Sequence, residues 1–281
     1  MNFSCLPVSL YPALSSGDLT LNDWFRFAQE LGLDGADVSI AHITSRSATN
    51  LRALRRQAAD SGVQIAMLVT YADFTHPNAD ERQRQIELLR ANIETAALLG
   101  SSFLRVTAGQ AHPGVSEAAG IDWAVHGLTT CLGDAAAAGV TLCYENHTIG
   151  YGWTHYDFSL PAPIFLEIAR RTEWSALRIL FDTANTLATD DDPLAVLDAV
   201  LDRVSMVHVS DIRRAGHFEP VVIGSGVAPI GAIFERLKSA GYHGWISVEE
   251  ASGSGEKGFR SAVETCKRLW QDMERQPTKD D

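Results

Sequence analysis

The sequence predicts an α/β protein built as a single (β/α)8 TIM barrel, because one local pattern recurs and the strand segments number eight. A helical stretch, a glycine and a short apolar strand follow one another in five segments: 28–39, 56–69, 96–106, 134–146 and 237–249. Glycine ends each helix because the next backbone position favours a left-handed conformation that glycine adopts readily. The apolar run after each glycine is typical of a buried parallel strand.

Three further strands are predicted, at 3–10, 178–182 and 204–210. Helices are expected at 18–31, 47–61, 79–99, 117–138, 159–173, 192–202, 228–240 and 255–274. Eight such units in 281 residues fit one barrel, which typically takes about 250 residues. A doubly wound sheet is the alternative, but its glycine-rich phosphate turn is missing after the first strand. We expect one barrel domain over 1–275 and a flexible tail over 276–281.

Composition and charge limit the kinds of molecule that the protein is expected to bind. With 23 Lys and Arg against 35 Asp and Glu, the net charge of −12 disfavours nucleic-acid binding. The N-terminus lacks the basic region of a signal peptide, and no apolar stretch approaches the roughly 20 residues of a membrane span. The four cysteines show no CxxC spacing and are predicted to be reduced thiols. We expect a cytoplasmic protein without membrane partners, and the sequence leaves a homo-oligomer open.

Four consecutive strands end in residues that bind metals. Glu145, Asp182, His208 and Glu249 close the fifth to the eighth strand, in that order. In a (β/α)8 barrel the carboxyl ends of the strands form one rim, where active sites lie. Three carboxylates and one imidazole suit Mn²⁺, Mg²⁺, Co²⁺ or Zn²⁺. We therefore predict one bound divalent metal ion, with Mn²⁺ favoured.

The alternation of side chains along a strand predicts which residues face the barrel interior. Ile246 and Val248 are aliphatic and should face the helices, which leaves Glu249 inside and Glu250 outside. His208 faces inward by the same argument. His147 lies two residues after Glu145 and so should be on its side of the strand.

Other polar residues near the rim have two interpretations each. Arg105, on the fourth strand, either binds a substrate carboxylate or phosphate or pairs with a buried acid. Trp153, in the loop after the fifth strand, either closes over a ligand or packs on the rim. Asp211 either caps a turn or holds Arg213.

The motifs YENHT (144–148), FDTAN (181–185), VHVSD (207–211) and GWISVEE (244–250) together resemble the sugar phosphate isomerase/epimerase superfamily, the xylose-isomerase-like barrels. That group includes ketose 3-epimerases, hydroxypyruvate isomerase, inosose dehydratase, 3-dehydroshikimate dehydratase and endonuclease IV. The resemblance implies that Glu145, Asp182, His208 and Glu249 bind the metal. One position departs from the family pattern, and another has two candidates in this sequence. Asn185 stands where ketose 3-epimerases generally carry histidine, and their downstream arginine corresponds to either Arg213 or Arg214.

The resulting hypothesis is a metal-dependent isomerase or epimerase of a sugar, sugar phosphate or related keto-polyol. Glu145 and Glu249, on opposite sides of the metal, would remove a proton next to the carbonyl and give an enediolate. The expected substrate-binding residues are His147, Asn185, Arg105, Arg213 and Trp153. The alternatives are a lyase, such as an inosose-type dehydratase, and a metal- or sugar-binding barrel without catalysis.

Overall fold

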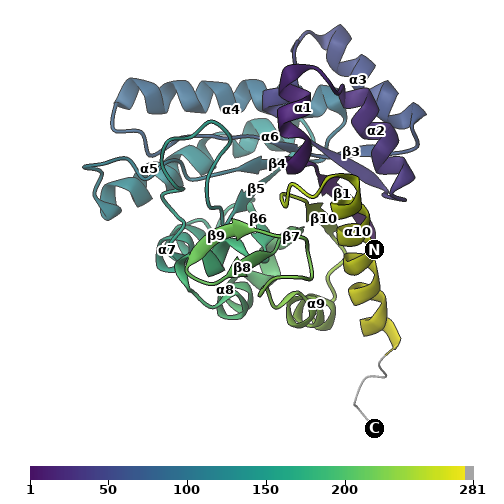
Figure 1. The fold of residues 1–281 in the computed structure, drawn as a ribbon. Coiled ribbons are helices and arrows are strands. Elements are labelled where there is room, and N and C mark those ends of the chain that lie inside the picture. Colours follow the sequence, from purple (N-terminus) through teal and green to yellow (C-terminus); the bar gives the residue numbers. More distant parts are fainter. Residues whose placement is uncertain (276–281) are drawn as a thin grey trace.

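The computed structural model, which describes residues 1–275, confirms the barrel (Figure 1). Eight parallel strands pair in the order β1-β10-β7-β6-β5-β4-β3-β2. They are β1 (Asn2–Leu6), β2 (Gly35–Ser39), β3 (Gln64–Val69), β4 (Phe103–Val106), β5 (Thr141–Glu145), β6 (Arg178–Asp182), β7 (Val204–Val209) and β10 (Trp245–Glu249). The predicted tail at 276–281 lies outside the described residues.

The barrel is nearly closed between β1 and β2. These strands lie side by side, and the amide of Asp34 donates to the carbonyl of Phe3 over 2.9 Å. The amide of Phe3 in turn donates to Oδ2 of Asp34 at 2.8 Å. A side chain thus supplies one of the bonds that a regular ladder would take from the backbone.

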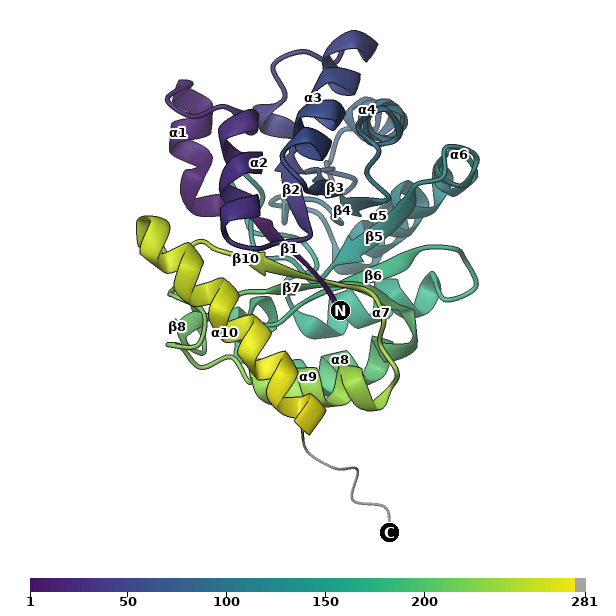
Figure 2. The same cartoon turned by 90° about the vertical axis from the view of Figure 1, so that its right-hand side faces the viewer.

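The helices surround the strands (Figure 2). They are α1 (Tyr11–Ser16), α2 (Leu21–Glu30), α3 (Ala48–Asp60), α4 (Ala79–Leu99), α5 (Glu117–Thr130), α6 (Leu132–Ala137), α7 (Ala162–Arg171), α8 (Pro193–Val200), α9 (Ile230–Ser239) and α10 (Gly255–Arg275). The five predicted helix-ending glycines, Gly32, Gly62, Gly100, Gly139 and Gly241, have φ between 67° and 81°. In each case the next amide donates back to the helix, as Ser101 does to the carbonyl of Ala96 at 3.0 Å.

Two of the predicted elements differ in extent from the structure. The first strand ends at Leu6 rather than at position 10, because Pro7 has no amide to donate and a 3₁₀ turn, Val8–Leu10, follows. The helix predicted at 117–138 is interrupted at Cys131, whose φ of −102° and ψ of 12° leave the helical region. A short antiparallel hairpin, β8 (Ile212–Arg214) and β9 (His217–Pro220), follows β7 and was not predicted.

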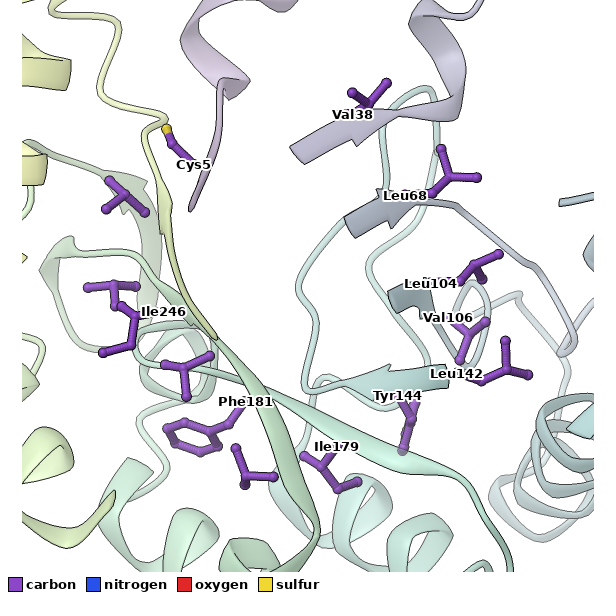
Figure 3. Packing of buried hydrophobic residues seen from close by; sticks show 14 of the residues in the cluster. Cys5, Val38, Leu68, Leu104, Val106, Leu142, Tyr144, Ile179, Phe181 and Ile246 are labelled. Atoms are coloured by element: carbon purple, nitrogen blue, oxygen red, sulfur yellow. The ribbon is translucent and has the colours of Figure 1, made fainter. Parts of the chain in front are cut away.

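Two apolar layers fill the molecule. The outer layer lies between strands and helices, and Figure 3 shows strand residues such as Val38, Leu104 and Phe181 pointing toward the helices. Tyr144 of β5, for example, packs on Phe165 of α7 with ring centroids 5.0 Å apart. The inner layer fills the barrel with Leu6, Tyr11, Ala66, Met67, Val69, Cys143, Leu180 and Met206. This division confirms the predicted alternation, with Val207, Val209, Ile246 and Val248 in the outer layer.

The four cysteines are free and buried, as predicted. Within residues 1–275, no helix combines the length and apolarity that crossing a membrane requires.

Candidate metal centre

Four side chains from successive strands meet at the carboxyl end of the barrel. Glu145 ends β5, Asp182 ends β6, His208 lies in β7 and Glu249 ends β10. One ligand atom from each lies within 4.8 Å of the other three. The first three side chains are fully buried, whereas that of Glu249 is 19% exposed and lies at the solvent side of the cluster.

The ligand atoms converge without satisfying one another. His208 Nδ1 lies 2.8 Å from Glu145 Oε1 and 2.8 Å from Glu249 Oε2, yet neither contact has the geometry of a hydrogen bond. Together with Asp182 Oδ2, these atoms have no hydrogen-bond partner among the described residues. Buried polar atoms are normally paired. Three carboxylate oxygens and one imidazole nitrogen aimed at one point therefore fit a divalent cation.

The electrostatics of the cluster also favour a cation. Burial raises the pKa of Asp182 to about 8, and the nearby carboxylates of Glu249 and Glu145 add to the shift. Burial opposes ionisation of Glu145 as well, but its pKa falls to about 2 because Arg105 and His208 attract its charge. A divalent ion at the centre would offset the repulsion among the carboxylates.

Other bonds orient two of the carboxylates. Asp182 Oδ1 accepts from the amides of Ala184 (2.9 Å) and Asn185 (2.7 Å) and from Ser210 Oγ (2.8 Å), which leaves Oδ2 for the centre. Glu145 Oε2 accepts from Arg105 Nη1 at 3.0 Å. Each of these carboxylates thus has one oxygen held by the protein and one free.

Asp37 extends the cluster on the far side of His208. Its Oδ2 lies 4.0 Å from His208 Nε2 and accepts from Ser247 Oγ at 2.5 Å. A carboxylate beside the second nitrogen of a ligating histidine orients the ring and sets its tautomer. The proximity of Asp37 to His208 depends on the packing of β2 against the barrel interior and is not evident from the sequence.

His147 lies beside the cluster, as strand alternation predicts. Its Nε2 is 3.9 Å from Glu145 Oε2, and its Nδ1 is 3.4 Å from Asp157 Oδ2. The ring of Trp153 meets that of His147 edge-on, with centroids 5.7 Å apart. Trp153 is thus brought to the cluster through His147. Asp157 was not anticipated, because nothing near it in the sequence marks it as a partner of His147.

The remaining predicted residues differ in position. Arg105 is buried and paired with Glu145, and its Nη2 donates to the carbonyl of Thr70 at 3.1 Å. Asn185 is buried in the loop after β6, and its Nδ2 donates to the carbonyl of Asn146 at 3.0 Å. Arg213 is not brought to the cluster. It projects from the hairpin, is 64% exposed and pairs with Glu219, while Arg214 is exposed as well.

Glu250 and Asp211 have roles in loop structure. Glu250 points away from the barrel interior, and its Oε1 accepts from the amide and hydroxyl of Ser252 just before α10. The alternation that separates it from Glu249 is as predicted. Asp211 accepts from the amides of Gly224, Gly226 and Ala228, so it holds a turn rather than Arg213.

Comparison with known proteins agrees with this architecture. Residues 25–269 match the family described as xylose isomerase-like TIM barrel. The chain belongs to this family. The L-ribulose-5-phosphate 3-epimerase UlaE of Shigella flexneri serotype 5b is 25% identical to this xylose isomerase-like barrel over 280 residues, 93% of each chain. The inosose dehydratase of Geobacillus thermodenitrificans is 31% identical over 150 residues, 46% of each chain.

Solved structures support the same fold. A D-tagatose 3-epimerase-like protein superposes with a TM-score of 0.79 at 20% identity and covers 98% of both chains. At this identity the likeness establishes the barrel and leaves the reaction to be inferred from the site.

Proposed function

We propose that this xylose isomerase-like barrel is a divalent-metal-dependent epimerase or isomerase of a ketose or related keto-polyol. The observation that carries the proposal is the set of four unpaired ligand atoms from Glu145, Asp182, His208 and Glu249. The epimerase names of full-length relatives point to the same class of reaction.

A bound divalent ion would polarise the substrate carbonyl and so lower the pKa of the C–H group on the neighbouring carbon. Mn²⁺ is the ion we favour, and Mg²⁺, Co²⁺ or Zn²⁺ suit the same donor set. The protein supplies the bases. Glu145 and Glu249 belong to strands on either side of His208, so their carboxylates approach a substrate from different directions. One would remove the proton and the other return it.

The surrounding residues would bind and orient the substrate. His147 directs Nε2 toward Glu145, and Trp153 covers the ring edge-on. We propose that both contact the sugar. Arg105 acts first by holding Glu145 ionised, and its unpaired Nε can donate to a substrate oxygen. Asn185 would act indirectly, because its bonds to Asn146 and Asp182 hold the loop after β6 in place. A role for Arg213 would require it to leave Glu219.

Proton transfer gives the decisive experiment. Protein loaded with Mn²⁺ is incubated with ketoses in D₂O, and deuterium at the carbon next to the carbonyl is measured by NMR. We expect exchange together with a new epimer or isomer of unchanged mass formula, and loss of both with Glu145→Gln. The proposal would be contradicted if the parent and Glu145→Gln both convert the substrate and neither incorporates deuterium.

A lyase is the second candidate, favoured by the partial match to an inosose dehydratase. The same enediolate would then expel the β-hydroxyl group, and a glutamate that holds a proton would protonate the departing oxygen so that it leaves as water. Mass spectrometry separates the two, because a dehydratase product is lighter by one water and an epimer is not. Keto-inositols should be included in the panel for this reason.

A further inference from the structure

Opposite the metal ligands, the mouth of the barrel carries a group of aromatic side chains that the proposed chemistry does not use. We call Tyr11, His42, Tyr71 and Tyr151 the aromatic wall. They come from the segments that follow β1, β2, β3 and β5: Tyr11 begins α1, His42 ends a 3₁₀ turn, and Tyr71 and Tyr151 lie in loops. Ring centroids are 4.5 Å apart for Tyr11 and His42, 5.5 Å for Tyr11 and Tyr151, and 6.3 Å for Tyr71 and Tyr151.

The wall carries a chain of hydroxyl groups. Tyr71 Oη lies 3.4 Å from Tyr11 Oη and 3.0 Å from Ser39 Oγ. Ser15 Oγ contacts both Tyr151 Oη at 2.9 Å and His42 Nε2 at 3.2 Å. Ring faces that alternate with hydroxyls match a polyol chain, whose carbons are apolar on one side and whose oxygens both donate and accept.

The wall borders the candidate metal centre directly. The guanidinium carbon of Arg105, which holds Glu145, lies 4.8 Å from the centre of the Tyr71 ring. Tyr11 is 6% exposed and belongs to the inner barrel layer, as does Leu6, the register partner of Glu249. A small molecule held at the metal by one end would therefore extend toward these tyrosines.

Two buried atoms in this region have no partner among the described residues: Arg105 Nε and His42 Nδ1. An oxygen of a ligand bound beside the wall would supply the missing partner for each. Charge argues for a neutral ligand. Arg105 is neutralised by Glu145, burial lowers the pKa of His42, and burial raises that of Tyr11. A phosphate group is recognised by charge-assisted bonds, which this neutral wall does not supply.

Tyr151 closes the wall from outside. It is 46% exposed, lies between Gly150 and Gly152, and reaches from the β5 loop to Ser15 of α1. We propose that the aromatic wall binds the end of a ketose or keto-polyol remote from its carbonyl, selects a free hydroxyl over a phosphate there, and closes through Tyr151. This inference rests on the proposed function, which places the carbonyl end at the metal.

The test is binding of matched sugars to the full protein loaded with Mn²⁺, measured by isothermal titration calorimetry. The pairs are L-ribulose with L-ribulose 5-phosphate and D-fructose with D-fructose 6-phosphate. We expect at least one free ketose to bind tenfold or more tightly than its phosphate, roughly the discrimination of one unmatched charged group. Equal or tighter binding of both phosphates, or no binding of any ketose, overturns the inference.

Variants localise the effect. Tyr71→Phe and Tyr151→Phe each remove one hydroxyl, and we expect the Kd of the preferred ketose to rise about three- to tenfold. Tyr156→Phe is the matched control, because Tyr156 lies in the same loop, is 52% exposed and stays outside the wall. An unchanged Kd in both wall variants would contradict the assignment. Deuterium exchange is scored separately, so a ketose that binds without exchange refutes the proposed reaction and leaves the wall intact.

Discussion

The adjacent glutamates at the end of β10 point to opposite faces of the strand, because successive side chains alternate along a strand. Glu249 presents an unpaired Oε2 2.8 Å from His208 Nδ1, whereas Glu250 is bonded to Ser252. The pair therefore provides a matched test of the centre within two consecutive residues of the same charge.

We predict that Glu249→Gln lowers kcat/KM by about 100-fold or more, since it removes both a ligand and a base. Glu250→Gln should stay within about threefold of the parent, because an amide oxygen can still accept from Ser252. Steady-state kinetics and metal content per chain are the measurements. The reverse ranking would show that the strand alternation has been assigned to the wrong faces.

Asp157 is the partner of His147 on the side away from Glu145. Both side chains are buried, and Nδ1 and Oδ2, 3.4 Å apart, have no other partner among the described residues. Asp157→Asn should reduce kcat/KM by about tenfold, as loss of an orienting bond typically does. Its Oδ1 bonds to Ser159 can persist, so the melting temperature should change little. Unaltered kinetics would assign Asp157 to loop structure alone.

Sequence patterns pointed to the four candidate ligands and to His147 because each follows an apolar strand at a recognisable position. Asp37, Asp157 and Tyr71 were not assigned to the site, because their roles depend on contacts between loops and strands distant in the chain. Arg213 is a different case. The resemblance alone suggested it, with Arg214 as the other candidate, and in the structure the hairpin turns its side chain toward Glu219 and solvent.

At the scale of elements, glycine punctuation located five helix ends, and apolar runs located the strands. Irregular segments at the barrel mouth were harder to predict. α1 and the β8–β9 hairpin are short, and tertiary contacts rather than periodicity determine them. Asp211 illustrates this, because its carboxylate accepts from three amides of the 224–228 turn, at 2.8 to 3.0 Å.

We predict that Asp211→Ala lowers the free energy of unfolding by about 2–4 kcal/mol, since three backbone amides lose the charged acceptor that this buried carboxylate provides. Urea denaturation followed by circular dichroism measures the change. Asp198→Ala is the control, because its ion pair with Arg236 is exposed and should contribute below about 1 kcal/mol. Equal losses in the two variants would contradict a specific role for the Asp211 bonds.

At the scale of the molecule, folding brings three carboxylates together whether or not a cation is present. The barrel buries Glu145, Asp182 and His208 completely. Without a metal ion, protons on Asp182 and His208 would reduce the repulsion among the carboxylates. The pKa of Asp182 rises from 3.8 to about 8 through burial and the neighbouring carboxylates. Burial would lower the pKa of His208, but attraction to Glu145 and Glu249 raises it above 6.5.

Both shifts make the folded metal-free state bind more protons than the unfolded state. The contribution of Asp182 is fully present below pH 3.8 and is lost as pH rises toward 8, and that of His208 is lost above pH 6.5. We therefore predict that the melting temperature of chelator-treated protein falls between pH 5 and 8, about where these groups titrate.

Saturating Mn²⁺ should raise the melting temperature by about 5–10 °C at pH 8 and flatten its dependence on pH, because the ion replaces the protons. Differential scanning fluorimetry with and without Mn²⁺ measures both effects. Asp182→Asn provides the control, since it removes one carboxylate and one ligand atom together, and it should keep only the part of the pH slope that His208 contributes and respond more weakly to Mn²⁺. A pH profile of the parent that Mn²⁺ leaves unchanged would contradict binding of Mn²⁺ at this cluster, and the same result with Mg²⁺, Co²⁺ and Zn²⁺ would exclude a metal centre there.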